Sequence, residues 1–211
     1  MEADFWHERW QNNQIGFHEG APNTLLTAHF AALGVPAGAT VFVPLCGKTN
    51  DLAWLRAQGY RVVGAELSRL AVEQFFAEQG LTPTITPAGK FERFESEGVT
   101  ILVGDLFGLD RTMLGPVDAI YDRAALVALP EPMRNRYAPH LLALTGSAPQ
   151  LLVTFEYDQS RATPPPHSVP ETEVRRHYGT AYRVELAERR DVPGGLKGIC
   201  PAEESAWLLE P

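Results

Sequence analysis

The sequence predicts an α/β fold in which a mostly parallel, doubly wound sheet of seven strands carries helices on both faces. From Thr40 onward, short apolar runs alternate with segments of helical periodicity, the arrangement that produces parallel βαβ units. Several of these runs end in a charged residue, which places polar side chains at the carboxyl edge of the sheet, where ligands of such folds bind. The last two runs are joined by a glycine-rich turn and predict an antiparallel pair.

Two βα units are predicted within residues 41–80. Their alternating strands and helices are expected at 41–45, 51–59, 61–66 and 68–80. Ser68 can cap the second helix, and Gly80 follows its last turn.

The remaining elements continue the pattern. Strands are predicted at 100–105, 118–122, 150–155, 182–186 and 205–209. A helix carries Met133 to Leu142, and Pro139 is expected to kink it or mark its start. A short helix is expected near 171–178. The proline-rich segment 163–167 can form neither a helix nor a central strand, so we expect a surface loop there, for which a lid and a plain linker are both open interpretations.

The N-terminal segment does not fit the βαβ pattern. It carries Trp6, Trp10 and Phe17 around an amide-rich stretch. We expect residues 1–30 to form a helical, aromatic cap on a single domain that spans residues 1–211.

Composition excludes several classes of protein. The chain has 211 residues, of which 45% are hydrophobic, enough for one domain with a substantial core. Its net charge of −8, with no basic run longer than a doublet, argues against a nucleic-acid partner. No secretory signal and no apolar run of roughly 18 residues is present, so we expect a cytoplasmic protein without membrane contact. Without a heptad pattern, a monomer is expected.

The two cysteines, Cys46 and Cys200, lie far apart and lack a metal-ligand spacing. We therefore expect reduced thiols, no disulfide framework and no metal site.

The turn after the first strand is the most informative segment. Gly47-Lys48-Thr49 resembles the end of a P-loop, but its first glycine is missing because Phe42 occupies that position. The dinucleotide fingerprint also fails, since Gly47 is the only glycine between Leu45 and the following helix. A cofactor with a pyrophosphate is thus disfavoured, whereas a nucleoside without phosphates is compatible with the turn.

Three charged residues at the ends of strands are candidates for binding such a nucleoside. Glu66 lies at the spacing from the turn glycine at which an acid accepts hydrogen bonds from both ribose hydroxyls. Asp105 can contact the adenine amine, with Leu106 packing on the ring, and Arg123 can pair with a ligand carboxylate. The structural alternatives are a solvated carboxylate for Glu66, a loop cap for Asp105, and a salt bridge with Asp122 or a surface acid for Arg123.

Read together, these segments resemble the thiopurine S-methyltransferase family, over nearly the full length and in order. The resemblance is carried by Trp6-x3-Trp10, Gly16-Phe17-His18, residues 42–48 (FVPLCGK), 62–68 (VVGAELS), 121–128 (YDRAALVA) and 155–158 (FEYD). The C-terminal region, with residues 194–198, is shorter than in eukaryotic members, so the chain is similar to bacterial-type members.

The resemblance implies a Rossmann-like methyltransferase fold and S-adenosyl-L-methionine as cofactor. It implies binding by Trp10, Leu45, Glu66 and Arg123, with Asp105 and Leu106 beside the adenine and Trp6 and Phe17 closing the site. It further implies that the arginine at position 123 lies near both cofactor and acceptor.

The expected function is methylation of aromatic or heterocyclic thiols (thiopurines), and also of selenium or tellurium compounds in detoxification. Because such a nucleophile arrives ionised, catalysis is expected to rest on alignment, with Arg123 and Asp158 orienting the acceptor. We find no Ser-His-Asp, Cys-His or two-carboxylate constellation, and we interpret His18 and His167 as loop residues. The alternatives are an NAD-dependent oxidoreductase and a non-catalytic nucleoside-binding sensor.

Overall fold

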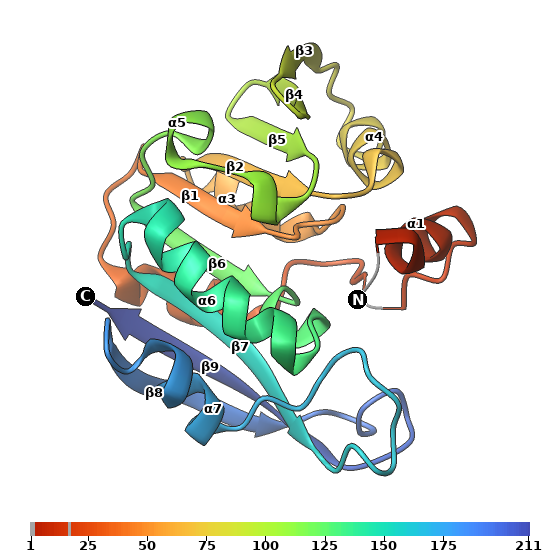
Figure 1. Ribbon diagram of the computed structural model, residues 1–211, viewed down its shortest axis with the longest axis vertical. Coiled ribbons are helices and arrows are strands. Elements are labelled where there is room, and N and C mark those ends of the chain that lie inside the picture. The colour runs from red at the N-terminus through yellow and green to blue at the C-terminus, as the bar shows by residue number, and fades with distance from the viewer. Residues whose placement is uncertain (1–2, 17) are drawn as a thin grey trace.

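The computed structural model describes residues 3–16 and 18–211, and one mixed sheet runs through it (Figure 1). Its strand order is β3-β4-β5-β2-β1-β6-β7-β9-β8. The strands are β1 Thr40–Pro44, β2 Arg61–Glu66, β3 Thr84–Ala88, β4 Phe91–Ser96, β5 Val99–Val103, β6 Ala119–Arg123, β7 Gln150–Tyr157, β8 Arg183–Asp191 and β9 Ala202–Glu210. The helices are α1 Ala3–Gln11, α2 Thr24–His29, α3 Asn50–Ala57, α4 Arg69–Glu78, α5 Arg111–Leu114, α6 Glu131–Thr145 and α7 Glu171–Tyr178, with 3-10 turns η1 Phe30–Leu33, η2 Leu106–Gly108 and η3 Leu126–Ala128.

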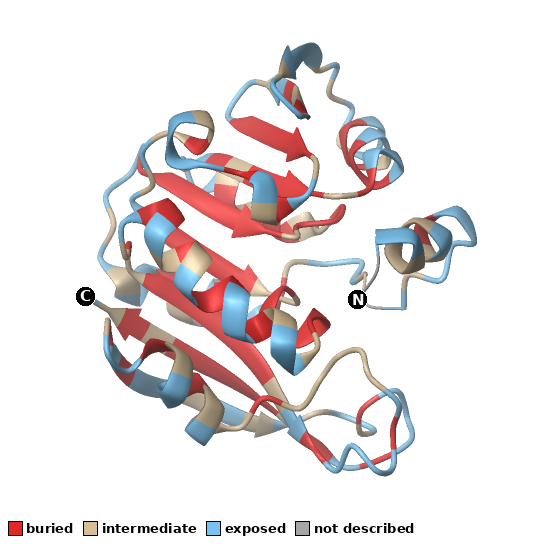
Figure 2. Ribbon diagram, viewed as in Figure 1, coloured by how far each residue is buried: buried red, intermediate tan, exposed pale blue. Residues whose placement is uncertain are grey.

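The predicted fold class is confirmed. Strands β5, β2, β1, β6 and β7 pair in parallel, and β9 pairs antiparallel with both β7 and β8. Helices α2, α3 and α4 pack on one face of the sheet, and α5, α6 and α7 on the other. Both faces are thus covered, and the central strands are buried, as Figure 2 shows.

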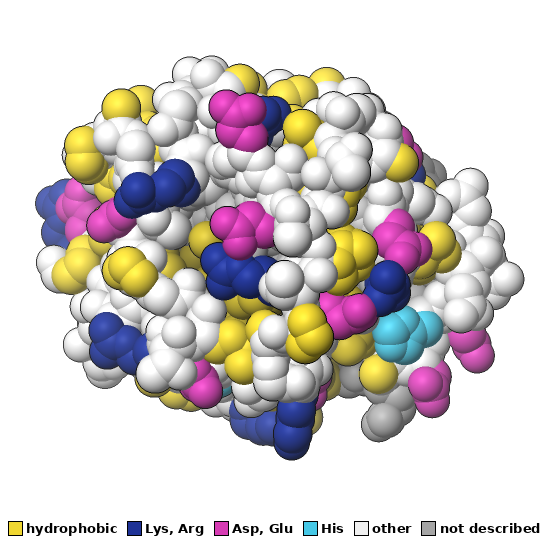
Figure 3. All heavy atoms as spheres, turned by 90° about the horizontal axis from the view of Figure 1, so that it is seen from above, with side chains coloured by type: hydrophobic (Ala, Val, Ile, Leu, Met, Phe, Trp, Pro, Cys, Tyr) yellow, Lys and Arg dark blue, Asp and Glu magenta, His cyan; other side chains and the backbone are white. Residues whose placement is uncertain are grey.

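Within the described residues the sheet has nine strands, not the seven predicted, because a hairpin of β3 and β4 extends it beyond β5. Strand β3 is almost entirely exposed, so it lacks the apolar run by which the other strands are recognised. It also contains Pro87, which an edge strand tolerates because one side of its ladder is unpaired. The face of the molecule seen in Figure 3 carries acidic and basic side chains intermixed with hydrophobic ones.

Helix α6 begins at Glu131 and runs through Pro139, so the proline does not mark its start. The carbonyl that loses its helical partner is that of Asn135, which is solvent exposed and can bond water instead. Tyr137 and Leu141 are buried on the opposite side and hold the helix on the sheet. Among the described residues, no helix has the length and apolar character that a membrane crossing requires.

Asp122 is a fully buried carboxyl near the end of β6. Burial raises its pKa to about 6, although hydrogen bonds from the Tyr137 hydroxyl (2.7 Å) and the Leu126 N–H (3.1 Å) oppose the rise. Between pH 4 and 6 the folded protein therefore holds a proton that the unfolded chain has released, and stability contributed by this group is lost as the pH rises.

Replacement of Asp122 by asparagine should remove this pH dependence. The unfolding free energy of Asp122→Asn, relative to the parent, is expected to increase by on the order of 1–3 kcal/mol between pH 4 and 7. Chemical denaturation of both proteins across this range measures the difference. A constant difference would show that Asp122 is ionised throughout.

Candidate functional site

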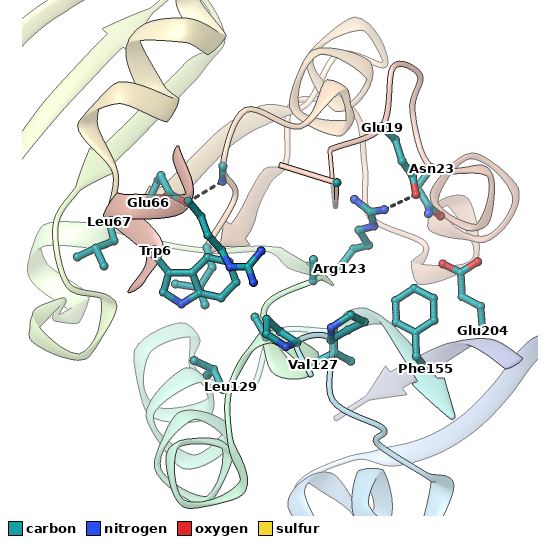
Figure 4. Close-up of a pocket in the computed structure, with 18 of the residues that line it drawn as sticks. Trp6, Glu19, Asn23, Glu66, Leu67, Arg123, Val127, Leu129, Phe155 and Glu204 are labelled. Atoms are coloured by element: carbon teal, nitrogen blue, oxygen red, sulfur yellow. Dashed lines mark hydrogen bonds and ion pairs between the residues drawn. The ribbon is translucent and has the colours of Figure 1, made fainter. Parts of the chain in front are cut away.

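A cavity of about 1260 Å³ opens at the carboxyl edge of the parallel strands, between α1, the segment after it, and the loop that joins β8 to β9. Its floor is built from the residues that follow β1, β2, β5 and β6, because parallel strands end at the same edge of a sheet. Figure 4 shows side chains from these distant segments directed toward one space. The cavity thus lies where the sequence predicts a ligand.

The turn after β1 has an unusual backbone. Leu45 has φ of 46° and Gly47 has φ of 52°, so two residues in three adopt the left-handed region. A Cβ at Gly47 would lie 3.1 Å from the Trp10 indole, which packs against the turn. Thr49 then caps α3 by accepting a hydrogen bond from Asp51 N–H. Leu45 and Gly47 both line the cavity, so the turn brings backbone directly to it.

Replacement of Gly47 by alanine tests this packing. Gly47→Ala is expected to lower the unfolding free energy by about 1–2 kcal/mol and to displace Trp10 from the cavity wall. Gly34→Ala is the matched control, because Gly34 also has positive φ (66°) but has no atom within 4 Å of the added carbon. Denaturation curves and indole fluorescence measure both effects. Equal losses in the two variants would show that backbone strain alone acts at Gly47.

Glu66 connects the turn after β1 to the end of β2. Its Oε2 accepts a hydrogen bond from Gly47 N–H (2.8 Å), and its Oε1 accepts one from Ser68 N–H (2.7 Å). The residue is only 6% exposed, and burial raises the pKa of the carboxyl, against which both backbone hydrogen bonds act. The carboxylate lines the cavity while it holds two loops, so it is not the solvated strand end of the alternative interpretation.

Asp105 and Leu106 lie at the next edge position, after β5. The Asp105 carboxylate accepts a hydrogen bond from Phe107 N–H (3.0 Å) and caps η2, as the structural alternative requires. Asp105 also lines the cavity and is exposed, whereas Leu106 is buried beneath it. Asp105 therefore caps η2 and lines the cavity at the same time.

Arg123 ends β6, and its nearly buried side chain lines the cavity. Its guanidinium donates a hydrogen bond to Glu19, which comes from the segment after α1 (Figure 4). The neighbouring Asp122 carboxyl instead accepts hydrogen bonds from Tyr137 and Leu126. Of the two salt bridges that the structural alternative allowed, the one with Asp122 is therefore not made, whereas one with a surface acid, Glu19, is present. Arg123 thus joins the N-terminal segment to the sheet.

The N-terminal aromatic residues lie over the cavity. Trp6 and Trp10, both from α1, line it, and Trp10 is buried. Phe17, which the resemblance places at the closure of the site, lies outside the described residues.

Three other sequence candidates are not brought to the cavity wall. The Asp158 carboxylate is exposed and accepts hydrogen bonds from the N–H and hydroxyl of Ser160. Neither His18 nor His167 is among the residues lining the cavity. Burial lowers the pKa of both imidazoles. The backbone N–H of His167 donates a hydrogen bond to the Val127 carbonyl. Both histidines thus lie in loops and outside the cavity wall, in agreement with their interpretation as loop residues.

The proline loop contributes to the wall through Pro165 and Pro166. It is attached to the rest of the molecule, because the Tyr157 hydroxyl donates to the Pro166 carbonyl (2.6 Å) and Lys197 Nζ donates to the Thr163 carbonyl (2.8 Å). The segment is therefore part of the site and more than a linker between elements.

Other lining residues were not among the site candidates named from the sequence, although Val127 and Phe155 lie within its family motifs. They lie in or just after η3, in α6, and on β7, β8 and β9, and include Val127, Leu129, Met133, Phe155, Arg190 and Glu204. No spacing in the chain relates Glu204 to Arg123, because β9 inserts between β7 and β8 and so brings the C-terminus to the cavity.

The amino-acid sequence matches a known protein family over nearly the whole chain. The sequence profile described as Thiopurine S-methyltransferase matches residues 1–206. A protein of Xanthobacter autotrophicus with that name is 60% identical over 211 residues, which cover 100% of this chain and 99% of its own. The chain belongs to the thiopurine S-methyltransferase family. It is accordingly an S-adenosylmethionine-dependent methyltransferase, and the family predicted from the sequence is confirmed.

Solved structures of low identity show the same fold. A Burkholderia thailandensis 1,6-didemethyltoxoflavin-N1-methyltransferase with bound S-adenosylhomocysteine superposes with a TM-score of 0.67 at 16% identity, covering 99% of this chain and 87% of its own. The magnesium protoporphyrin IX methyltransferase of Synechocystis gives 0.66 at 13% identity, covering 99% of each chain. The Rossmann-like methyltransferase architecture is therefore confirmed.

Proposed function

We propose that this thiopurine S-methyltransferase family member transfers a methyl group to aromatic and heterocyclic thiols. The observation that carries the proposal is a single cavity that has the buried Glu66 carboxylate, beside the turn of Gly47, on one side and Arg123 on the other (Figure 4). These two sides are the two ends of the cavity, and many of the side chains around Arg123 are apolar. A cofactor and an acceptor can thus meet inside one cavity.

The first end fits the cofactor. Glu66 has two carboxylate oxygens at the wall, each with a lone pair beyond its backbone hydrogen bond, and these can accept the ribose hydroxyls. Asp105 and Leu106 offer an acceptor and an apolar surface for adenine, and Trp10 and Leu45 border the turn between them. When bound there, S-adenosylmethionine supplies an electrophilic methyl group.

The second end fits a flat, apolar acceptor. Its walls are formed by Val127, Leu129, Met133, Phe155, Pro165 and Pro166. The Arg123 guanidinium lies among these groups and can stabilise a thiolate, whose negative charge would otherwise be poorly solvated in this space. The residues align the acceptor sulfur, exclude water and balance its charge, and no side-chain base is required for an acceptor that is already ionised.

The same end is suited to other soft nucleophiles. We propose that reduced selenium and tellurium compounds are also methylated, in detoxification, because their soft anions can lie against the same apolar walls beside the Arg123 guanidinium. We further propose that residues 1–211 act as one domain and as a monomer in the cytoplasm, on small molecules and without a nucleic-acid partner.

Calorimetric titration with S-adenosylhomocysteine, followed by turnover with thiols and selenols, tests the proposal. Saturable one-to-one binding and release of S-adenosylhomocysteine with a thiol are expected. Binding without turnover on any thiol or selenol would overturn the proposed acceptors and favour the sensor. Stabilisation of the protein by NAD(H), and not by S-adenosylhomocysteine, would favour the oxidoreductase.

A further inference from the structure

A buried carboxylate lies at the acceptor end of the cavity, in a position usually occupied by apolar residues. Glu204 belongs to β9, which is paired on both sides, and its side chain is only 10% exposed. Its partner across one ladder is Phe155 of β7, and its partner across the other is Arg190 of β8. Paired residues lie on the same face of a sheet, so the carboxylate stands beside the Phe155 ring (Figure 4).

The ion pair of Glu204 leaves one of its oxygens available. Arg190 donates from Nε (3.2 Å) and from its terminal nitrogen (2.7 Å), and both hydrogen bonds go to Oε2. Oε1 therefore lies outside this ion pair. Both Glu204 and Phe155 line the cavity, as does Glu19, whose pKa is raised mainly by burial and in small part by the charge of Glu204. The carboxylate thus shares the end of the cavity that contains Arg123.

The need to neutralise the charge of Arg190 does not explain why an acid is buried at position 204. Arg190 is about one-third exposed (34%), and a second carboxylate, that of Glu188, lies 3.9 Å from its guanidinium. An arginine with this exposure needs no buried partner, whereas burying a carboxylate is costly unless its hydrogen bonds are satisfied. A donor from within the cavity would satisfy Oε1.

We propose that Glu204 determines acceptor specificity: its Oε1 accepts a hydrogen bond from a ring N–H of a heterocyclic thiol that lies against Phe155. This role rests on the proposed thiol methyltransferase function. Arg190 positions the carboxylate through Oε2, and Phe155 provides a flat surface for the ring. Acceptors with a ring N–H are favoured over those of the same shape that lack one, because the latter would cover the Oε1 oxygen without giving it a hydrogen-bond donor.

Two acceptors of similar shape test this inference. Benzimidazole-2-thiol keeps one ring N–H when its thiol ionises, whereas benzothiazole-2-thiol has sulfur at that position and keeps none. In Glu204→Gln, Arg190 should hold the amide oxygen, so the amide N–H₂ replaces Oε1 toward the cavity. The kcat/KM for benzimidazole-2-thiol is expected to fall about tenfold or more, and that for benzothiazole-2-thiol to change less than about threefold.

Binding measurements separate this inference from the proposed function. Dissociation constants of both heterocycles for the protein loaded with S-adenosylhomocysteine should show the same contrast, whether or not methyl transfer occurs. Glu203→Gln, on the opposite face of β9, is the control and should alter neither. An equal loss for both heterocycles, or none, in Glu204→Gln would overturn the role of Glu204. Absence of transfer by the parent, with the binding contrast retained, would instead overturn only the thiol methyltransferase function.

Discussion

Replacing Arg123 with methionine is expected to lower kcat/KM for a thiol acceptor about 100-fold, and replacing it with lysine about 10-fold. The guanidinium is nearly buried at the cavity wall, whereas Arg190, which also lines the cavity, is about one-third exposed (34%) and is paired with Glu204, so Arg123 is the less solvated counter-charge for a thiolate. Methionine retains much of the side-chain volume but removes the charge, while lysine retains the charge as a point without the planar fork. Initial rates of S-adenosylhomocysteine release measure both variants.

Glu19→Gln is the control for this experiment, because Arg123 also holds Glu19 of the N-terminal segment. If Arg123 acts on the acceptor, Glu19→Gln should retain most of the activity. Equal losses in Glu19→Gln and Arg123→Met would show that Arg123 acts by fixing the segment over the cavity. Unchanged kinetics in Arg123→Lys would mean that a point charge is sufficient and that the planar fork has no role.

Removal of the Glu66 carboxylate should affect cofactor affinity most. Glu66→Ala is expected to bind S-adenosylhomocysteine more weakly by about 1–3 kcal/mol, since the ribose hydroxyls lose a charged acceptor in a buried place. The unfolding free energy should also fall by about 1–3 kcal/mol, because Gly47 N–H and Ser68 N–H lose their partner. Calorimetry and chemical denaturation measure the two effects separately.

Glu66→Gln distinguishes the two roles of this side chain. Its amide oxygen can still accept one backbone N–H, so much of the stability should be retained while the charge is lost. A cofactor affinity equal to that of the parent, in both folded variants, would show that the ribose does not lie at Glu66. A loss of affinity in the well-folded Glu66→Gln would support the placement directly.

The central part of the fold was predictable because its signals are local. Apolar runs marked the parallel strands, Ser68 caps α4 as expected, and α7 has the predicted bounds of Glu171 and Tyr178. The hairpin of β3 and β4 was missed for the same reason: β3 is exposed and contains a proline, so it has no local pattern of burial. Its pairing with the edge of β5 through β4 becomes visible only in the assembled sheet.

The candidate site also has a part that local sequence signals predict and a part that they do not predict. Glu66 and Arg123 end the parallel strands β2 and β6, and Asp105 follows the parallel strand β5. The geometry of parallel sheets alone places such residues at one edge. Asp158 also follows a strand, β7, yet its side chain bonds within its own turn and does not reach the cavity. The position of a residue at a strand end therefore predicts its edge of the sheet but not the direction of its side chain.

The sequence by itself determined the α/β class, the family and the residues that we propose to bind the cofactor, because these depend on periodicity and on motifs within short segments. Only the tertiary structure brought together the residues of the proposed acceptor end. There Glu204 meets Phe155 and Arg190 because β9 lies between β7 and β8, and Glu19 meets Arg123 across 104 residues of chain. Contacts between segments so distant are set by packing and by sheet order, for which the chain carries no local signal.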